Sequence, residues 1–222
     1  MEKKSIILPM DMLNVPTSLV AIGGEGPDEN INLPGPYPFV VAADSGADLL
    51  EKFGVSPDVL VGDLDSISEK NGFLGLCKEK AKTDKDESDF ELALMKVDTA
   101  CYDLIGGGGG RMDHFVMIWS VFLRFSPPRF WFTKHDFLVS FKHIRFSLPV
   151  DTLVTVMAID EKVVNAKSKG LKWELDNFPL SYKAVSLSNR TDEEVVEIEG
   201  DDTLFLRMDI NDHGRLEILS LC

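Results

Sequence analysis

Acidic and glycine-rich motifs stand at four points of this 222-residue chain, most of them directly after a hydrophobic run that reads as a strand. The motifs are Asp44-Ser-Gly46, Gly62-Asp-Leu-Asp-Ser66, Asp84-Lys-Asp-Glu-Ser-Asp89, and Gly106–Gly110 running into Arg111-Met-Asp-His114. In an open parallel sheet, ligands bind outside the carboxyl ends of the strands, so these motifs would meet at one edge. So many carboxylates side by side repel one another unless cations neutralise them. The sequence therefore predicts a site for Mg²⁺ with a nucleotide polyphosphate.

The whole-chain composition is that of an ordinary globular protein with one large or two small domains. The net charge of −14 argues against a nucleic-acid-binding surface, but not against a nucleotide that arrives with Mg²⁺. Cys77, Cys101 and Cys222 lack the spacing of zinc ligands and are expected to be reduced thiols. We find neither a signal peptide nor an apolar run of membrane-spanning length, and we expect a cytoplasmic protein.

Strand-like and helix-like patterns alternate over the first part of the chain, which predicts βαβ units and a mostly parallel, Rossmann-like sheet. Beyond it, short alternating runs recur without helical patterns between them, which is typical of an antiparallel sandwich. We therefore expect an α/β domain at 1–143 and an all-β sandwich at 144–222. Strands are expected at 17–22, 39–43, 59–61, 102–105, 130–132, 152–158, 171–175, 184–188, 195–198, 203–208 and 215–221.

Three helices are expected in the first domain, at 47–53, 88–97 and 111–125. Ser88 and Glu91 match a capping box at the start of the second helix. The third is apolar almost all round, which indicates a buried helix.

Asp63 and Asp65 are two residues apart, a spacing that points both carboxylates to one face of an extended segment. Such an oxygen clamp suits a hard cation such as Mg²⁺. A solvated turn is the alternative, since Asp and Ser are common turn residues. The buried strand before the pair favours the metal site.

Asp84, Asp86 and Asp89 lie before and within the first turn of an expected helix, where the helix dipole favours carboxylates. The helix dipole alone is enough to explain why an aspartate stands at position 89. The clustering of the three acids indicates a bound cation, and Lys85 would offset one charge or reach a phosphate.

The five glycines suit a loop whose N–H groups cradle a phosphate at the start of the next helix. The run is neither a Walker A motif nor a dinucleotide fingerprint, because Arg111 stands where the third glycine would be. A flexible loop is the alternative. Arg111 would grip phosphate and Asp113 would add a carboxylate, while His114 is either a general base, a nucleotide contact or an ordinary helix residue.

In the second domain, Trp173 and the segment Ser186-Leu-Ser-Asn189 stand out. A tryptophan can stack on a flat heteroaromatic ligand, although most tryptophans of a sandwich belong to its core. Ser188 and Asn189 are more often turn residues than ligands.

The order and spacing of these motifs resemble the thiamine pyrophosphokinases over most of the chain. The resemblance is carried by Ala43-Asp-Ser-Gly46, the motifs at 62–66 and 84–89, the glycine loop into His114, Gly170-Leu-Lys-Trp173 and Ser186-Leu-Ser-Asn189. The chain departs from the family at Leu64, where phenylalanine is frequent, and at Ser88, where threonine is. The stretches 28–38 and 130–144 match nothing that we can place.

The resemblance implies a homodimer that transfers pyrophosphate from ATP to the hydroxyl of thiamine, giving thiamine diphosphate and AMP. It implies catalytic roles for Asp63, Asp65, Asp89 and Asp113, and Mg²⁺ ligands among Asp63, Asp65, Asp86 and Asp89. Further substrate contacts are implied for Asp44, Gly46, Lys85, Asp86, Ser88, Gly109, Gly110, Arg111 and His114. Ser186, Ser188 and Asn189 lie where the family lines its thiamine pocket across the dimer interface.

Two other readings remain open at this point. A nucleotide-sugar transferase would use Asp63 and Asp65 as its metal clamp, but it leaves the other motifs without a role. A non-catalytic nucleotide or thiamine sensor would bind its ligand without producing AMP. The number of acids favours an enzyme, because a pure binder gains little from them.

Overall fold

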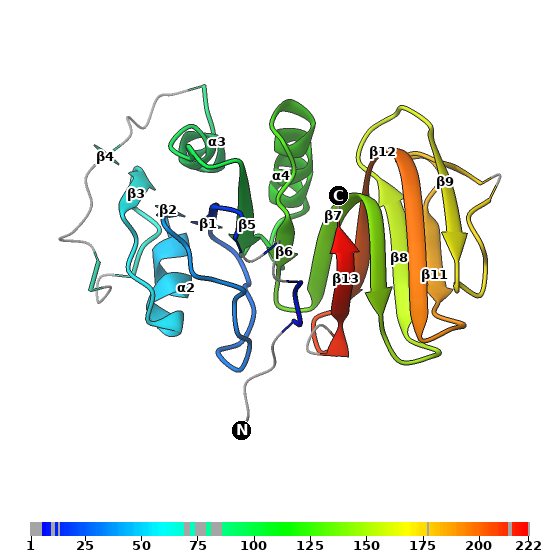
Figure 1. Cartoon of the computed structure of the whole chain (residues 1–222). Helices are drawn as coiled ribbons and strands as arrows, with labels where there is room; N and C mark the ends of the chain where they lie inside the picture. Colours follow the sequence, from blue (N-terminus) through cyan, green and yellow to red (C-terminus); the bar gives the residue numbers. More distant parts are fainter. Residues whose placement is uncertain are drawn as a thin grey trace. The chain divides into compact units, whose positions relative to one another are not determined.

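The computed structural model describes residues 6–9, 12, 14–68, 72–73, 79–80, 86–176, 178–212 and 215–221. Asp84, Lys85, Cys77 and Cys222 lie outside the described residues. The chain forms two compact units (Figure 1). The helix-bearing unit comprises Val15–Glu29 and Gly35–Lys134, and the β unit comprises Met1–Asn14, Asn30–Pro34 and His135–Cys222. The expected division after residue 143 falls within the first long strand of the β unit.

A parallel sheet forms the centre of the helix-bearing unit. Its strands stand in the order β6 (Phe130–Phe132), β5 (Cys101–Ile105), β1 (Thr17–Ala21), β2 (Val40–Ala43), β3 (Val59–Gly62) and β4 (Glu79–Lys80). Every neighbouring pair in this order is parallel. The strands expected at 17–22, 39–43, 59–61, 102–105 and 130–132 are thus confirmed to within a residue or two.

The strand order reverses between β1 and β5, so the loops after these two strands flank a switch point. The crossover from β2 to β3 runs through α2 (Gly46–Phe53), and that from β5 to β6 runs the opposite way through α4 (Met112–Arg124). Because both crossovers are right-handed, α2 and α4 lie on opposite faces of the sheet. The short helix α3 (Asp89–Leu94) lies beside α4 (Figure 1), with the Phe90 and Phe122 rings 6.1 Å apart.

Helix α4 is far less buried than its composition suggested, and the expectation of a buried helix was wrong. Its buried residues are Ile118, Val121 and Phe122, which face the sheet. Much of the remaining surface of the helix is exposed and apolar, with Met112 81%, Val116 59% and Leu123 53% exposed. An apolar pattern all round a helix does not reveal which side meets the core.

A buried ion pair joins Asp103, in the middle of β5, to Arg129, the residue before β6. Asp103 is fully buried, and its carboxylate accepts hydrogen bonds from Arg129 Nε at 2.9 Å and Nη2 at 2.7 Å. The Tyr37 hydroxyl donates a further bond to it at 2.9 Å. Burial raises the pKa of Asp103, against the opposing effect of Arg129 and Tyr37. The three side chains hold one another, because a buried carboxylate without partners is costly.

The β unit is built from antiparallel strands. They are β7 (Asp136–Ser147), β8 (Leu153–Ala158), β9 (Val164–Lys169), β10 (Pro179–Leu180), β11 (Ser186–Arg190), β12 (Val195–Asp209) and β13 (Glu217–Leu221). Strand β12 pairs with β7 along its length, with β9 in its first half and with β8 in its second half. Strand β13 pairs with β7, β11 pairs with β8, and β10 pairs with β9, each in the antiparallel direction. The strands expected at 195–198 and 203–208 are therefore one continuous strand.

The strand expected at 171–175 was wrong. In this segment only Leu171 makes an isolated bridge, to Thr191. The Glu174 carboxylate accepts a hydrogen bond from the Gly170 N–H at 2.8 Å, and the Leu175 N–H donates to Ser168 Oγ at 2.8 Å. These bonds fold the chain back on itself, so an alternating sequence forms a turn.

None of the described helices is long and apolar enough to cross a membrane.

Candidate functional site

A pocket of about 430 Å³ lies at the carboxyl ends of β1, β2 and β5 in the helix-bearing unit. Seven of the residues for which the resemblance implies catalysis or substrate contact line it: Asp44, Ser88, Asp89, Gly109, Gly110, Arg111 and His114. The parallel sheet therefore brings three of the four motifs to one place, together with Ser66 from the remaining motif.

Asp44 is held over the end of the neighbouring strand β3. Its backbone has a φ of 44°, and its Oδ1 accepts a hydrogen bond from the Leu64 N–H at 3.0 Å. A Cβ at Gly62 would lie 2.0 Å from the same carboxylate oxygen. Only glycine at position 62 leaves room for the Asp44 carboxylate, so two motifs form one structural unit.

The acids of this unit crowd one another. The pKa of Asp44 is raised from 3.8 to about 7, chiefly by burial and also by its hydrogen bond to Asp89 and the nearby charges of Asp89 and Asp63. The Leu64 N–H opposes the shift. A pair of carboxyl groups that shares a proton is a place where a cation can replace that proton.

The start of α3 is fixed by the predicted capping box, which the structure confirms. Ser88 Oγ accepts a bond from the Glu91 N–H, and the Glu91 carboxylate accepts bonds from the Ser88 N–H at 2.9 Å and hydroxyl at 2.8 Å. The same carboxylate pairs with Arg124 in the last turn of α4. Glu91 thereby holds Ser88 and Asp89 at the pocket and ties α3 to α4.

Asp63 and Asp65 lie beside the pocket, without being among the described residues that line it. The Asp65 N–H donates to Asp63 Oδ1 at 3.2 Å, and the Ser66 hydroxyl donates to Asp65 Oδ1 at 2.9 Å. Asp86 is exposed in the bend before α3.

Within the described ranges, no three His, Cys, Asp or Glu side chains are close enough together to form a metal cage. Mg²⁺ commonly takes one or two carboxylates and completes its shell with waters and phosphates. The paired carboxyls of Asp44 and Asp89, with Asp63 nearby, fit that donor set.

The glycine loop after β5 is anchored at its start. A Cβ at Gly106 would lie 2.1 Å from the Ile22 carbonyl oxygen, and the Trp131 indole donates to the Gly106 carbonyl at 2.9 Å. The Gly107 N–H donates to the Gly23 carbonyl at 2.9 Å. These contacts argue against a flexible loop over its first residues. Gly46, at the start of α2, is similarly packed, since a Cβ there would lie 2.2 Å from the Ala21 carbonyl oxygen.

Arg111 and Asp113 pair with each other at the start of α4. Arg111 Nε donates to Asp113 Oδ1 at 3.0 Å, and Nη2 pairs with Oδ2. The side chains are 73% and 59% exposed, and exposed ion pairs contribute little stability. Arg111 can therefore exchange this partner for a phosphate at small cost. The pair also holds His114, whose N–H donates to Asp113 Oδ1 at 3.1 Å.

In the β unit, Asn189 is buried and its amide is fully used within the protein. Its Nδ2 donates to the Trp173 carbonyl at 2.7 Å and to Ser186 Oγ at 3.0 Å, while its Oδ1 accepts from the Trp173 N–H at 3.2 Å. Trp173 is 55% exposed and hence no core residue, and Lys172 lies over its ring. Ser188 is exposed, with a φ of 57° at an irregularity of β11. Asn189 thus positions an exposed aromatic side chain.

Several pocket residues were missed by reading the sequence. They are Ile22, Phe90, Met117 and Ile118. Ile22 stands at a strand end, which was a usable signal. The other three are apolar helix residues, and their sequence positions do not distinguish a pocket wall from a core.

Comparison with known proteins finds two matching family models. Residues 34–130 match the catalytic domain of thiamin pyrophosphokinase, and residues 143–205 match its vitamin B1 binding domain. Thiamine pyrophosphokinase 1 of Oryza sativa subsp. japonica is 28% identical over 170 residues, covering 67% of this chain and 64% of that protein. Thiamine pyrophosphokinase 2 of Arabidopsis thaliana is 24% identical over 179 residues, covering 71% and 67%. The match thus spans less than two thirds of the rice protein.

Solved structures share the fold. The thiamine pyrophosphokinase of Bacillus subtilis superposes with a TM-score of 0.70 at 17% identity, covering 87% of this chain and 99% of that one. The enzyme from Candida albicans has a TM-score of 0.66 at 17% identity, covering 93% of each chain.

Proposed function

We propose, since this chain belongs to the thiamin pyrophosphokinase family, that it transfers a pyrophosphoryl group from ATP to the hydroxyl of thiamine, giving thiamine diphosphate and AMP. One observation carries the proposal beyond family membership. The pocket at the switch point combines the acid pair Asp44–Asp89, an exchangeable Arg111 and a glycine loop. Acids for a metal, a cation for phosphate and backbone N–H groups are the parts that phosphoryl transfer requires.

Mg²⁺ would be held by Asp89 with Asp63, Asp65 and Asp86, and it would neutralise charge on the polyphosphate oxygens. The raised pKa of Asp44 supports this assignment, because crowded carboxyls are relieved by a cation.

The chain's own residues would act mostly by positioning. Arg111, with the N–H groups of Gly109 and Gly110, would hold the transferred phosphates in line with the thiamine hydroxyl. The hydroxyl oxygen attacks the β-phosphorus, and the bond from that phosphorus to the oxygen bridging toward the α-phosphate breaks, so that AMP leaves. Asp89 or Asp113 would accept the hydroxyl proton. Lys85, Ser88 and His114 would contact the nucleotide or its phosphates.

The two units would divide the work. We assign ATP and Mg²⁺ to the helix-bearing unit, as a Rossmann-like domain, and thiamine to the β unit, as a sandwich. In the β unit Ser186 and Ser188 would contact thiamine, and Asn189 would hold Trp173 against it. The resemblance also suggests a homodimer with thiamine at the interface between the two copies. We expect this dimer to work in the cytoplasm. The apolar exposed face of α4 supports a dimer, since such a face gains from being covered.

The test is to incubate the purified protein with ATP, Mg²⁺ and thiamine and to identify the nucleotide product. We expect thiamine-dependent AMP and an equal amount of thiamine diphosphate. ADP with thiamine monophosphate would instead mean an ordinary kinase. Thiamine binding without turnover would favour a sensor, and consumption of a nucleotide sugar without ATP would favour a sugar transferase.

A further inference from the structure

Glu91 carries a buried charge to which neither the sequence motifs nor the proposed chemistry gives a role. Its side chain is 9% exposed, and its two carboxylate oxygens have different partners. Oε2 accepts hydrogen bonds from the Ser88 N–H at 2.9 Å and from the Ser88 hydroxyl at 2.8 Å, whereas Oε1 pairs with Nη1 of Arg124. One oxygen therefore caps the start of α3, and the other binds the last residue of α4.

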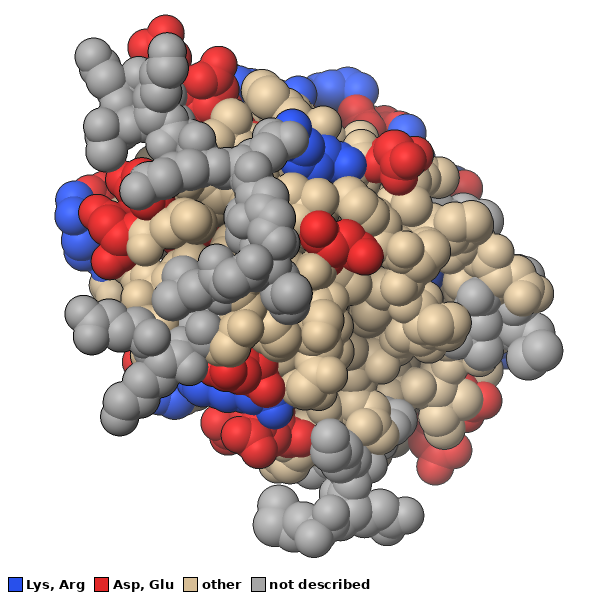
Figure 2. All heavy atoms as spheres, turned by 90° about the vertical axis from the view of Figure 1, so that its left-hand side faces the viewer, with Lys and Arg blue, Asp and Glu red and all other residues tan. Residues whose placement is uncertain are grey.

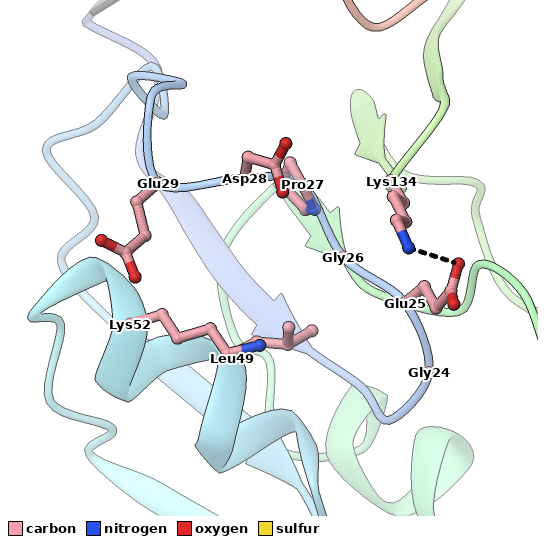
Figure 3. A pocket seen from close by; sticks show the side chains of 9 residues that line it. All are labelled: Gly24, Glu25, Gly26, Pro27, Asp28, Glu29, Leu49, Lys52 and Lys134. Atoms are coloured by element: carbon pink, nitrogen blue, oxygen red, sulfur yellow. Dashed lines mark ion pairs between the residues drawn. The ribbon is translucent and has the colours of Figure 1, made fainter. Parts of the chain in front are cut away.

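Burial distinguishes the pair Glu91–Arg124 from the exposed ion pairs of the same unit. Figure 2 shows exposed charges of both signs scattered over one face of the molecule. The pair of Lys134 with Glu25 in Figure 3 is an exposed one, 3.5 Å long, with side chains 44% and 48% exposed. Such pairs contribute little, whereas a buried carboxylate that loses its partner keeps an uncompensated charge. The position of Glu91 relative to Arg124 is therefore strongly constrained.

Helix α3 depends on its neighbours for its position. It has six residues, and a helix of that length is not stable by itself. Part of its packing is on α4, where the Phe90 and Phe122 rings lie edge to face with centroids 6.1 Å apart. A charge-assisted hydrogen bond has a stricter geometry than a contact between rings. The pair Glu91–Arg124 therefore sets how Asp89, the first residue of α3, lies relative to α4.

Helix α4 connects this ion pair to the glycine loop. It has 13 residues, which makes it about 20 Å long, and Arg111 precedes its first residue. At its other end, Arg124 Nε and Nη2 donate to the Ser120 carbonyl and hydroxyl, both at 3.4 Å, which orients the guanidinium. Arg111 and Asp89 both line the pocket at the switch point. One helix and one buried ion pair thus relate an acid of the site to its arginine.

We propose that Glu91 is a positioning residue of the transfer reaction, which through Arg124 holds Asp89 in place to share a Mg²⁺ with the phosphates bound by Arg111. Glu91 is not among the described residues that line the pocket, so it acts through Asp89. A polyphosphate should therefore bind more tightly with Mg²⁺ than without it, and this gain should depend on Glu91. The inference rests on the proposed function for the reaction, but its main test is a binding measurement.

The experiment measures the Kd of tripolyphosphate for the full chain in Mg²⁺ and in EDTA, and the ratio of the two values is the metal gain. Glu91→Gln keeps a capping box, since glutamine also serves at this position, but its neutral amide lacks the charge that binds Arg124. We expect the metal gain to fall about tenfold, as one charge-assisted contact is lost. The Kd in EDTA should stay within about twofold of the wild-type value.

Steady-state kinetics of the same variant give a second result. Misplacement of Asp89 should lower kcat about tenfold to 100-fold and leave the KM for thiamine unchanged. Arg124→Lys keeps a cation at the end of α4 without the planar fork, so it should lower the metal gain by no more than about threefold. A purely structural role of Glu91 would move neither the metal gain nor kcat.

The matched control is Asp136→Asn, which makes the same change from carboxylate to amide in the ion pair of Asp136 with Arg207 in the β unit. It should leave the metal gain and kcat unchanged, even if it lowers stability. Arg124→Met and the double variant Glu91→Gln/Arg124→Met complete a cycle. Because both residues act through one contact, the double variant should lose no more of the metal gain than Arg124→Met does. Arg124 is 52% exposed, so its variants carry the test should Glu91→Gln not fold.

An unchanged metal gain in Glu91→Gln or Arg124→Met would overturn the inference, as would an equal loss in Asp136→Asn. A wild-type chain that binds tripolyphosphate equally well in Mg²⁺ and in EDTA would overturn it too. The proposed function fails separately: loss of the metal gain in variants of a chain without thiamine-dependent turnover would support the positioning role and contradict the enzyme. A normal kcat in Glu91→Gln, beside an active wild type, would contradict the positioning role alone.

Discussion

The acidic pocket of the helix-bearing unit and the Trp173 region of the β unit use polar side chains in opposite ways. In the pocket, Asp44 and Asp89 face each other, and Arg111 has a weak, exposed partner. In the β unit, the Asn189 amide forms its hydrogen bonds within the protein, and the ring of Trp173 remains exposed. The first arrangement keeps charges ready for exchange with a ligand, whereas the second presents a rigid apolar surface. The difference fits the proposed division, in which chemistry belongs to one unit and recognition of a flat ring to the other.

The largest effect on activity is expected for the variant Asp89→Asn, which alters the acidic pocket alone. Removing one carboxylate from the acid pair should lower kcat by about 100-fold to 1000-fold, the usual loss when one electrostatic contact of a transition state is removed. The thermal unfolding temperature should hardly change. Asp98→Asn, an exposed aspartate of the same unit, serves as the control in steady-state assays. Near-normal turnover in Asp89→Asn would remove this residue from the chemistry.

Trp173→Ala tests the proposed recognition of thiamine by the β unit. Loss of a stacking surface should raise the KM for thiamine about tenfold to 100-fold and leave the KM for ATP unchanged. Tyr182→Ala, which removes another half-exposed aromatic ring of the β unit, is the matched control. An equal rise of both KM values would contradict the division between the units.

Asn189→Ala should affect the β unit in two ways. It leaves the Trp173 backbone groups and Ser186 without their partner, which should lower the free energy of unfolding by about 2 kcal/mol. The KM for thiamine should rise by less than in Trp173→Ala, because the ring remains but is held less firmly. Denaturant titration and steady-state kinetics measure the two effects. Lower stability with an unchanged KM would make Asn189 purely structural.

Asp44 allows a test of how the stability of the chain depends on pH. Its pKa is raised from 3.8 to about 7 on folding, so the folded chain holds the proton more tightly. Its contribution to stability is complete below about pH 4 and is lost as the pH rises through about 7. Asp44→Asn should therefore flatten the fall in unfolding free energy between these values. Denaturant titrations of both chains without Mg²⁺ measure this difference, and parallel pH profiles would contradict the shift.

Local signals in the sequence were sufficient to predict where two of the motifs meet. The hydrophobic runs before Asp44 and Gly62 predicted two neighbouring strand ends, and the two motifs meet there. The capping box at Ser88 was equally local, and its geometry is as expected. Such features depend on residues close in sequence, so a pattern of a few positions defines them.

Features that depend on distant contacts escaped the sequence analysis. The backbone hydrogen bonds between Glu25 and Gly108 join the loops after β1 and β5, and the sequence of neither loop indicates the other as its partner. Strand β12 was read as two strands because Gly200, Asp201 and Asp202 look like a turn. The side chains of Asn165 and Lys162 satisfy these aspartates, and the strand continues past them.

The most direct measurement of the central claim uses ATP with radioactive phosphorus at the β position. Incubation with thiamine, Mg²⁺ and the wild-type chain should move all of the transferred label into thiamine diphosphate and leave unlabelled AMP. Label that stays in ADP while thiamine monophosphate forms would contradict pyrophosphoryl transfer at this site.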